Sequence, residues 1–145
     1  MFRKNFQVIA FLAFLFICTG FLFADECALE GIWEGTESGA VLSGNVKHRN
    51  KTTQETEYFS GLGIKFIFEK PQGHLFHGKK ISENHTEEFV GVMSRDKKTI
   101  YFSDDDGYSI GTIIDPDTIE YIYLHSGKDS KAAAISTLKR VKGEK

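Results

Sequence analysis

From residue 30 onward, short runs rich in Ile, Val, Tyr, Phe and Thr alternate with turn signals along the chain. No stretch carries apolar residues at helical spacing for even three turns. In the run 62–69, Ile64, Phe66 and Phe68 share one face while charged side chains lie on the other, which is typical of a half-buried strand. The pattern therefore predicts an all-β domain.

Eight runs of this kind are separated by turn residues. They span 31–39, 62–69, 75–81, 87–93, 99–103, 108–114, 118–124 and 132–141. The polar stretch 46–57 is predicted to be a long loop, with one irregular strand leading into Tyr58 and Phe59. Three consecutive alanines in the last run leave a short helix as the alternative there.

Loops this short require antiparallel neighbours, so the runs predict an antiparallel eight-stranded up-and-down meander. Such a meander leaves no exposed edge when it closes into a small barrel, and an open sandwich of the same strands is the alternative. Glycines inside predicted strands permit the strong coiling that closure needs. Five strands carry one, namely Gly35, Gly63, Gly78, Gly91 and Gly111.

Aromatic residues supply the candidate ligand site. If their face is inward, they line the barrel with rings and hydroxyls that orient a small or hydrophobic ligand. If it is outward, they are cross-strand pairs that stabilise the sheet. The candidate ligand-binding residues are Tyr101, Tyr108, Tyr121, Tyr123 and Phe66.

Gly31-Ile32-Trp33 opens the first strand, and Arg140 stands near the end of the last one. This pairing resembles the calycin arrangement of lipocalins, fatty-acid-binding proteins and avidins. The resemblance implies that the indole of Trp33 packs against Arg140 and closes one mouth, a contact that gains about 1 kcal/mol of cation–π energy. The chain lacks lipocalin disulfides and the tryptophans of an avidin site, so biotin binding is not implied.

The N-terminus has the order of a secretory signal peptide. Two cations precede an uncharged apolar run of seventeen residues from Val8 to Ala24, and Asp25 and Glu26 follow it. We therefore expect a signal peptide at 1–24 and a single domain at 25–145, exported to the periplasm or outside the cell and without a stable membrane span after cleavage. Leu22 fits a cleavage site poorly, and an uncleaved anchor is the alternative.

Charge and cysteine content narrow the function classes. Without residues 1–24 the chain keeps 16 cations and 20 acids, and this mild acidity argues against nucleic acid as a partner. Cys27 is then the only cysteine, so the fold has no internal disulfide, and a disulfide-linked dimer is the minority interpretation of this thiol.

No pattern predicts catalytic residues, a metal site or a cofactor. Nucleophile motifs and phosphate loops are absent, and no two of the five histidines have metal-ligand spacing. The acidic run 104–106 before Gly107 is predicted to be a hairpin tip rather than a calcium loop.

The favoured function is binding of a small or hydrophobic ligand. The alternative is an interaction protein, such as an enzyme inhibitor or envelope component, with a packed barrel and a working surface at 44–57. An isomerase or cyclase is the third hypothesis, and the oligomeric state stays open.

Overall fold

The computed structural model describes residues 29–46, 51–128 and 130–143, including all of their side chains except those of 43–54. The predicted signal segment 1–24 and Cys27 lie outside the described residues. Eight strands follow one another: β1 (Gly31–Val46), β2 (Lys51–Phe68), β3 (Leu75–Ile81), β4 (Thr86–Met93), β5 (Thr99–Ser103), β6 (Tyr108–Asp115), β7 (Thr118–Ser126) and β8 (Lys131–Arg140).

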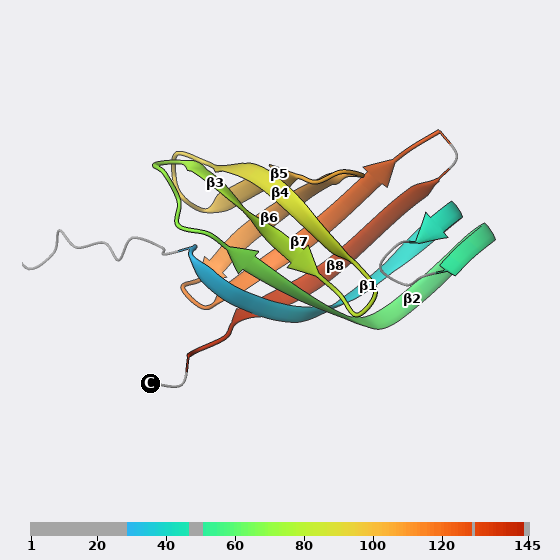
Figure 1. Ribbon diagram of the computed structural model, residues 1–145, viewed down its shortest axis with the longest axis horizontal. Coiled ribbons are helices and arrows are strands. Elements are labelled where there is room, and N and C mark those ends of the chain that lie inside the picture. The colour runs from blue at the N-terminus through green and yellow to red at the C-terminus, as the bar shows by residue number, and fades with distance from the viewer. Residues whose placement is uncertain (1–28, 47–50, 129, 144–145) are drawn as a thin grey trace, which may run out of the picture.

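Each strand pairs antiparallel with the next, and β8 returns to pair with β1 (Figure 1). The sheet is therefore a closed barrel, and the predicted fold class is confirmed. The three alanines of β8 pair with β7 on one side and β1 on the other, so the short helix considered there is not formed.

Side chains alternate between the interior and the outer face because successive residues of a strand point to opposite sides of the sheet. On β3 the buried side chains are Phe76 and Lys80, and on β4 they are Glu87, Phe89 and Met93. Half of the interior is packed by aromatic rings whose centroids lie 4.9–6.5 Å apart. These rings belong to Trp33, Phe66, Phe68, Phe76, Phe89, Phe102 and Tyr121.

The aromatic core presses directly on the backbone of β4 at Gly91. A Cβ at this position would lie 2.6 Å from the Cβ of Phe102 and would also meet the ring of Phe76. Gly63 on β2 differs, because a Cβ there would have no heavy atom within 4 Å. The glycine at 91 is therefore required by packing, and the glycine at 63 is not.

We expect Gly91→Ala to lower the free energy of unfolding by about 1–3 kcal/mol, the usual range for overpacking a core. Gly63→Ala is the matched control in another strand and should change it by less than about 0.5 kcal/mol. Urea unfolding of both variants measures the difference. Equal effects of the two substitutions would contradict the close approach of the rings to β4.

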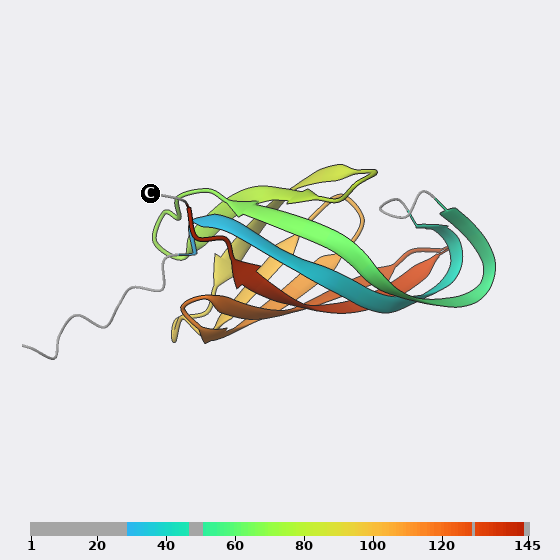
Figure 2. The same cartoon turned by 90° about the horizontal axis from the view of Figure 1, so that it is seen from below.

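The first two strands extend beyond the barrel as a two-stranded ribbon. β2 pairs with β3 only from Lys65 to Phe68, whereas its pairing with β1 continues to Val46 and Lys51 (Figures 1 and 2). The prediction of a long loop at 46–57 is therefore wrong for residues 51–57. Three threonines there favour extended backbone, and main-chain hydrogen bonds form a ladder even where no apolar face marks the strand in the sequence.

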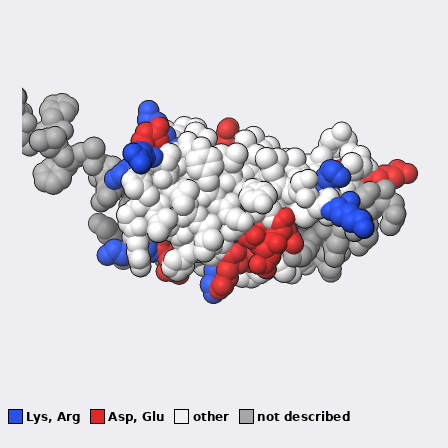
Figure 3. Space-filling model, turned by 90° about the horizontal axis from the view of Figure 1, so that it is seen from above, with Lys and Arg blue, Asp and Glu red and all other residues white. Residues whose placement is uncertain are grey.

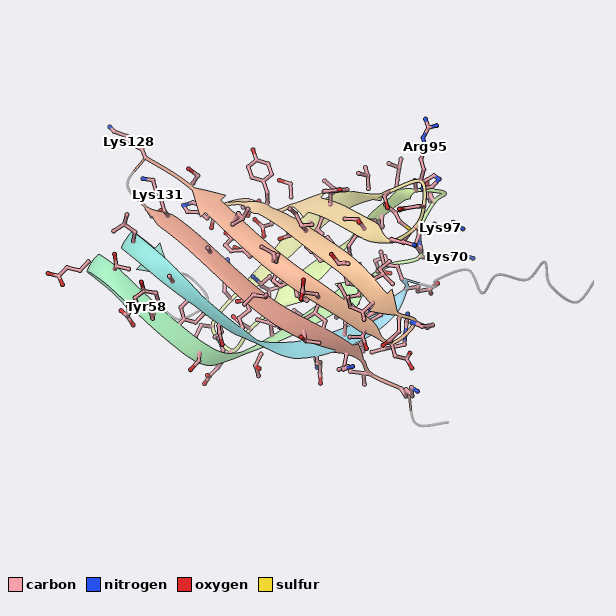
Figure 4. All side chains as sticks on the ribbon, turned by 180° about the vertical axis from the view of Figure 1, so that it is seen from behind. Tyr58, Lys70, Arg95, Lys97, Lys128 and Lys131 are labelled. Carbon is pink, nitrogen blue, oxygen red and sulfur yellow. The ribbon has the colours of Figure 1, made fainter. Side chains whose placement is uncertain are left out.

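The two ends of the barrel differ. The β2–β3, β4–β5 and β6–β7 turns lie at the end where β1 begins and β8 finishes, and the ribbon projects from the opposite end (Figure 1). Labelled side chains show the same division, because Lys70, Arg95 and Lys97 lie at the first end and Tyr58 and Lys131 at the second (Figure 4). We call the first the Trp33 end and the second the ribbon end.

Part of the outer face of β3 to β6 is apolar. Figure 3 views the molecule from the side on which β3, β4 and β5 lie in Figure 1, and it shows a broad area without charged side chains. Leu75, Val92, Tyr101 and Ile110 form one row across the four strands, since each is the register partner of the next. A shallow groove of about 720 Å³ runs over this face.

Candidate functional site

A cavity of about 240 Å³ opens at the ribbon end. Its walls are mostly apolar, and polar groups gather at its floor and at its rim. The walls are formed by Val41, Phe59, Leu62, Tyr123, Ala132 and Ala134. The floor holds Glu37, Lys80 and Glu87, and the rim holds Asp106, His125, Ser130 and Lys131. Apolar walls with a few convergent polar groups are typical of small-molecule sites.

The floor is built on a buried ion pair. Lys80 is 2% exposed and Glu37 is 3% exposed, and the Lys80 Nζ lies 3.1 Å from the Glu37 Oε1. Glu87, the register partner of Lys80 on β4, is also buried, and its Oε1 lies 3.4 Å from the Nε2 of His85. Burying such charges is strongly unfavourable unless they are paired, which explains why the cation and the carboxylates occur together.

Two tyrosines complete the surroundings of the ammonium. The Lys80 Nζ donates a hydrogen bond to the Tyr121 hydroxyl at 3.2 Å, and the Ser109 hydroxyl donates to the same oxygen at 3.3 Å. The Nζ also lies 4.6 Å from the centroid of the Tyr123 ring, within cation–π range. The lysine is therefore held from several sides and does not reorient freely.

Two buried polar atoms at this level lack a hydrogen-bond partner among the described residues. They are the Glu37 Oε1, whose contact with Lys80 is close in distance but unsuited in angle, and the Ser136 hydroxyl. Ser136 is the register partner of both Glu37 and Tyr121, so it belongs to the same layer of the barrel. Buried polar groups are nearly always satisfied in folded proteins, and these two leave hydrogen-bonding capacity for a further polar group.

Burial raises the pKa of both interior tyrosines. For Tyr121 the negative charge of Glu37 adds to the effect of burial, and hydrogen bonding from Ser109 partly opposes it. For Tyr123, after burial, the charges of Asp104 and Glu87 raise the pKa further. Both phenols keep their protons where the unfolded chain, with a tyrosine pKa of about 10, loses them. Their contribution to stability is complete below pH about 10 and is lost as the pH rises beyond it.

We expect an alkaline absorbance titration to show this difference. At pH about 11.5, the native protein should display less phenolate than the urea-unfolded protein, by the equivalent of two tyrosines. In the Tyr121→Phe variant, the difference in phenolate between the native and the unfolded protein should fall to the equivalent of one tyrosine. Full phenolate absorbance in the native wild type at that pH would contradict the burial of these two hydroxyls.

The structure separates the five candidate ligand-binding residues. Tyr123 lines the cavity, Tyr121 lies beneath it, and Phe66 is packed inside the aromatic half of the barrel. Tyr101 and Tyr108 lie on the outer face, 48% and 71% exposed, so for these two residues the outward alternative describes the structure. Their strands place neighbouring residues inward instead, because side chains alternate along a strand.

Trp33 and Arg140 lie together at the Trp33 end. The Arg140 guanidinium lies 4.2 Å from the centroid of the indole, and its Nη1 donates to the Glu30 carbonyl at 2.7 Å. The indole Nε1 donates to the Leu29 carbonyl at 3.0 Å, and Arg140 also bonds the Pro116 carbonyl in the β6–β7 turn. The guanidinium thus ties three segments over the indole at this end.

The described residues hold no group of three or more His, Cys, Asp and Glu side chains placed to bind a metal ion. Nor does any helix in this part of the chain have the length and apolarity to cross a membrane.

The fold and the site define a class: a small closed β-barrel of eight antiparallel strands, with one packed half and a cavity at the other end. No protein-family model matches the chain, and no curated protein matches it. A redesigned β-barrel is similar in structure, at 14% identity and a TM-score of 0.48, covering 79% of this chain and 92% of its own. The S-type phycobiliprotein lyase CPES from Guillardia theta is similar at 12% identity and a TM-score of 0.36, covering 80% and 90%. With scores this low, the class rests on the strand pairing of the chain itself.

Proposed function

We propose that the protein is an exported binding protein that holds a small ligand, apolar with one polar group, in the cavity at the ribbon end. The observation that carries this proposal is the buried Lys80–Glu37 pair at the floor of a cavity with apolar walls. A barrel that is only a scaffold gains nothing from charges at this depth, since well-packed apolar residues are as stable or more so. Polar groups fixed at the end of an apolar pocket orient a ligand.

The size of the cavity limits the ligand. At about 240 Å³ it is smaller than the roughly 300–1,000 Å³ of pockets that hold drug-sized molecules. The aromatic rings below the floor leave no continuation toward the Trp33 end. A short-chain acid, amine or aromatic alcohol matches these dimensions better than a long lipid does.

Neighbouring alanines on β8 allow a matched test. Ala132 lines the cavity, whereas Ala133 is exposed on the outer face. Short-chain fatty acids, aliphatic amines and aromatic alcohols are screened for a rise in the Tm of the wild type. The hits should no longer raise the Tm of Ala132→Phe, because the phenyl ring fills the cavity, and should still raise that of Ala133→Phe. Hits that bind both variants equally would place binding elsewhere and contradict the proposal.

Export is the second part of the proposal and is supported by the charge and apolar pattern of residues 1–24. When the full chain is expressed with its N-terminus intact, the exported fraction should contain a protein whose mass matches a chain that begins at Asp25. Recovery of the uncleaved chain in the membrane fraction would instead favour the anchor.

A calycin-type barrel is the finer form of the fold that we propose. It is supported by Trp33 at the start of β1 and by the guanidinium of Arg140 over its indole. In this arrangement the pair closes the Trp33 end, and the ligand enters at the ribbon end.

An interaction protein is the second candidate function, and one observation favours it. The outer face of β3 to β6 exposes Leu75, Val90, Val92, Tyr101 and Tyr108 together, and contiguous apolar patches on soluble proteins often mark contact sites. The working surface expected at 44–57 is a different one, and most of its side chains lie outside the described set.

A further inference from the structure

Two turns at the rim of the cavity bring a hydroxyl, an imidazole and a carbonyl into one chain of contacts. The Nε2 of His125, on β7, lies 2.7 Å from the hydroxyl oxygen of Ser130, which precedes β8. The Nδ1 of the same ring contacts the main-chain carbonyl of Asp106 in the β5–β6 turn. No sequence motif marks this group, since Asp106 lies in the β5–β6 turn and His125 and Ser130 lie in the β7–β8 hairpin.

The carbonyl determines which nitrogen of the neutral ring carries the proton. A carbonyl oxygen only accepts hydrogen bonds, so Nδ1 must donate to Asp106. Nε2 then has a free lone pair, and the Ser130 hydroxyl donates to it. This is the arrangement of an activated nucleophile, in which a hydroxyl donates to a base whose other nitrogen is oriented by a third group.

Local sequence features hold the three groups in place. The Asp104 Oδ1 accepts hydrogen bonds from the main-chain nitrogens of Asp106 and Gly107, at 3.1 and 2.8 Å, which fixes the turn that carries the carbonyl. On the other side, the main-chain nitrogen of Gly127 donates to the Ser130 carbonyl at 2.9 Å. A Cβ at Gly127 would lie 3.0 Å from the His125 Nε2, so a glycine there gives the imidazole its room.

His125, Ser130 and Lys131 all line the cavity described above, so a molecule held by the apolar walls reaches the hydroxyl. The side chain of Lys131, which follows Ser130, is exposed on the same side of β8 as Ala133. We propose that Ser130 is a nucleophile toward small carboxylic esters, with His125 as its general base. This activity goes beyond ligand binding.

The proposed step balances without a cofactor. The Ser130 Oγ attacks the ester carbonyl carbon while its proton passes to the His125 Nε2. The bond from that carbon to the alcohol oxygen then breaks, and the alcohol leaves with the proton from Nε2. Water releases the acyl group from Ser130 by the same route, which yields a carboxylic acid and restores the hydroxyl.

A fluorophosphonate probe tests the nucleophile, because it forms a phosphorus–oxygen bond with an activated serine and releases fluoride. Intact-mass analysis of the native protein should show one adduct, and peptide mapping should place it on Ser130. Ser130→Ala should remove the adduct, and Ser126→Ala, in the same hairpin, should keep it. His125→Gln retains an amide that can donate to Asp106 but offers no base, so labelling should slow by about 100-fold or more.

Hydrolysis of a nitrophenyl acetate ester follows the same variants as a second readout, and thermal melting checks that each is folded. The proposal is overturned if the wild type is labelled no faster than Ser130→Ala, or if His125→Gln is labelled as fast as the wild type.

Discussion

Replacement of Lys80 by methionine is expected to lower the free energy of unfolding by about 3–5 kcal/mol. Methionine has a similar length and fits the same space, so the loss comes from charge rather than from a cavity. Without the ammonium, the buried carboxylate of Glu37 loses its partner at 3.1 Å, and the Tyr121 hydroxyl loses one of its two donors. An unpaired charge in the interior is among the most unfavourable states that a single substitution creates.

Two further variants separate this cause from others. Adding Glu37→Gln to Lys80→Met removes the orphaned charge and should recover a large part of the loss. Lys79→Met is the surface control, because Lys79 forms an exposed ion pair with Glu88 at 3.4 Å. This substitution should change the free energy of unfolding by less than about 0.5 kcal/mol. Urea unfolding measures all three. A double variant that is less stable than Lys80→Met would show that the two residues are not coupled as a buried pair.

Phe66→Ala should lower the free energy of unfolding by about 3–5 kcal/mol as well, but for a different reason. The ring is fully buried, and its centroid lies 5.0 Å from that of Tyr121 and 5.9 Å from those of Phe68, Phe89 and Phe102. Removing the ring leaves a void. The neighbouring rings cannot move in to fill it, because each is held in place by the backbone of its own strand.

Tyr58→Ala on the ribbon is the control for loss of an aromatic ring. Tyr58 is 80% exposed, so its removal should change the free energy of unfolding by less than about 0.5 kcal/mol. Chemical unfolding followed by Trp33 fluorescence compares the two variants. A loss below about 1 kcal/mol for Phe66→Ala would mean that this half of the barrel is not packed.

The fold could be predicted because its signal is local. Six of the eight predicted strands agree with the structure to within two residues at each end, since turn residues and period-two alternation mark them directly. The exceptions were β1, whose end lies in the ribbon, and β2, whose start lies there. Alternation of apolar residues marks strands with a buried face, and a ribbon beyond the barrel has little of one.

The structure divides the predicted ligand-binding residues between the interior and the outer face. Phe66, Tyr121 and Tyr123 are inside, but Tyr101 and Tyr108 are not, because aromatic character alone does not show which face of a strand is inward. Alternation could have corrected this, since Ile100 and Phe102 flank Tyr101 and take the interior.

The same alternation carried the signal for the charged floor. Lys80 shares its side of β3 with Phe76, Glu87 shares its side of β4 with Phe89, and both charges therefore had to be inside. Their meeting with Glu37 depends on strand register and on closure of the barrel, which sequence spacing does not determine. The contact between His125 and Ser130 depends likewise on the conformation of a turn.

The central claim is that the cavity at the ribbon end binds a small molecule, and methyl NMR tests it most directly. Val41 and Leu62 carry methyl groups in the cavity wall, whereas Leu75, Val90 and Val92 carry them on the outer apolar face. On titration with the strongest hit of the thermal screen, the methyl signals of Val41 and Leu62 should shift and the other three should stay in place. Shifts confined to Leu75, Val90 and Val92 would contradict the claim and place the binding surface outside the barrel.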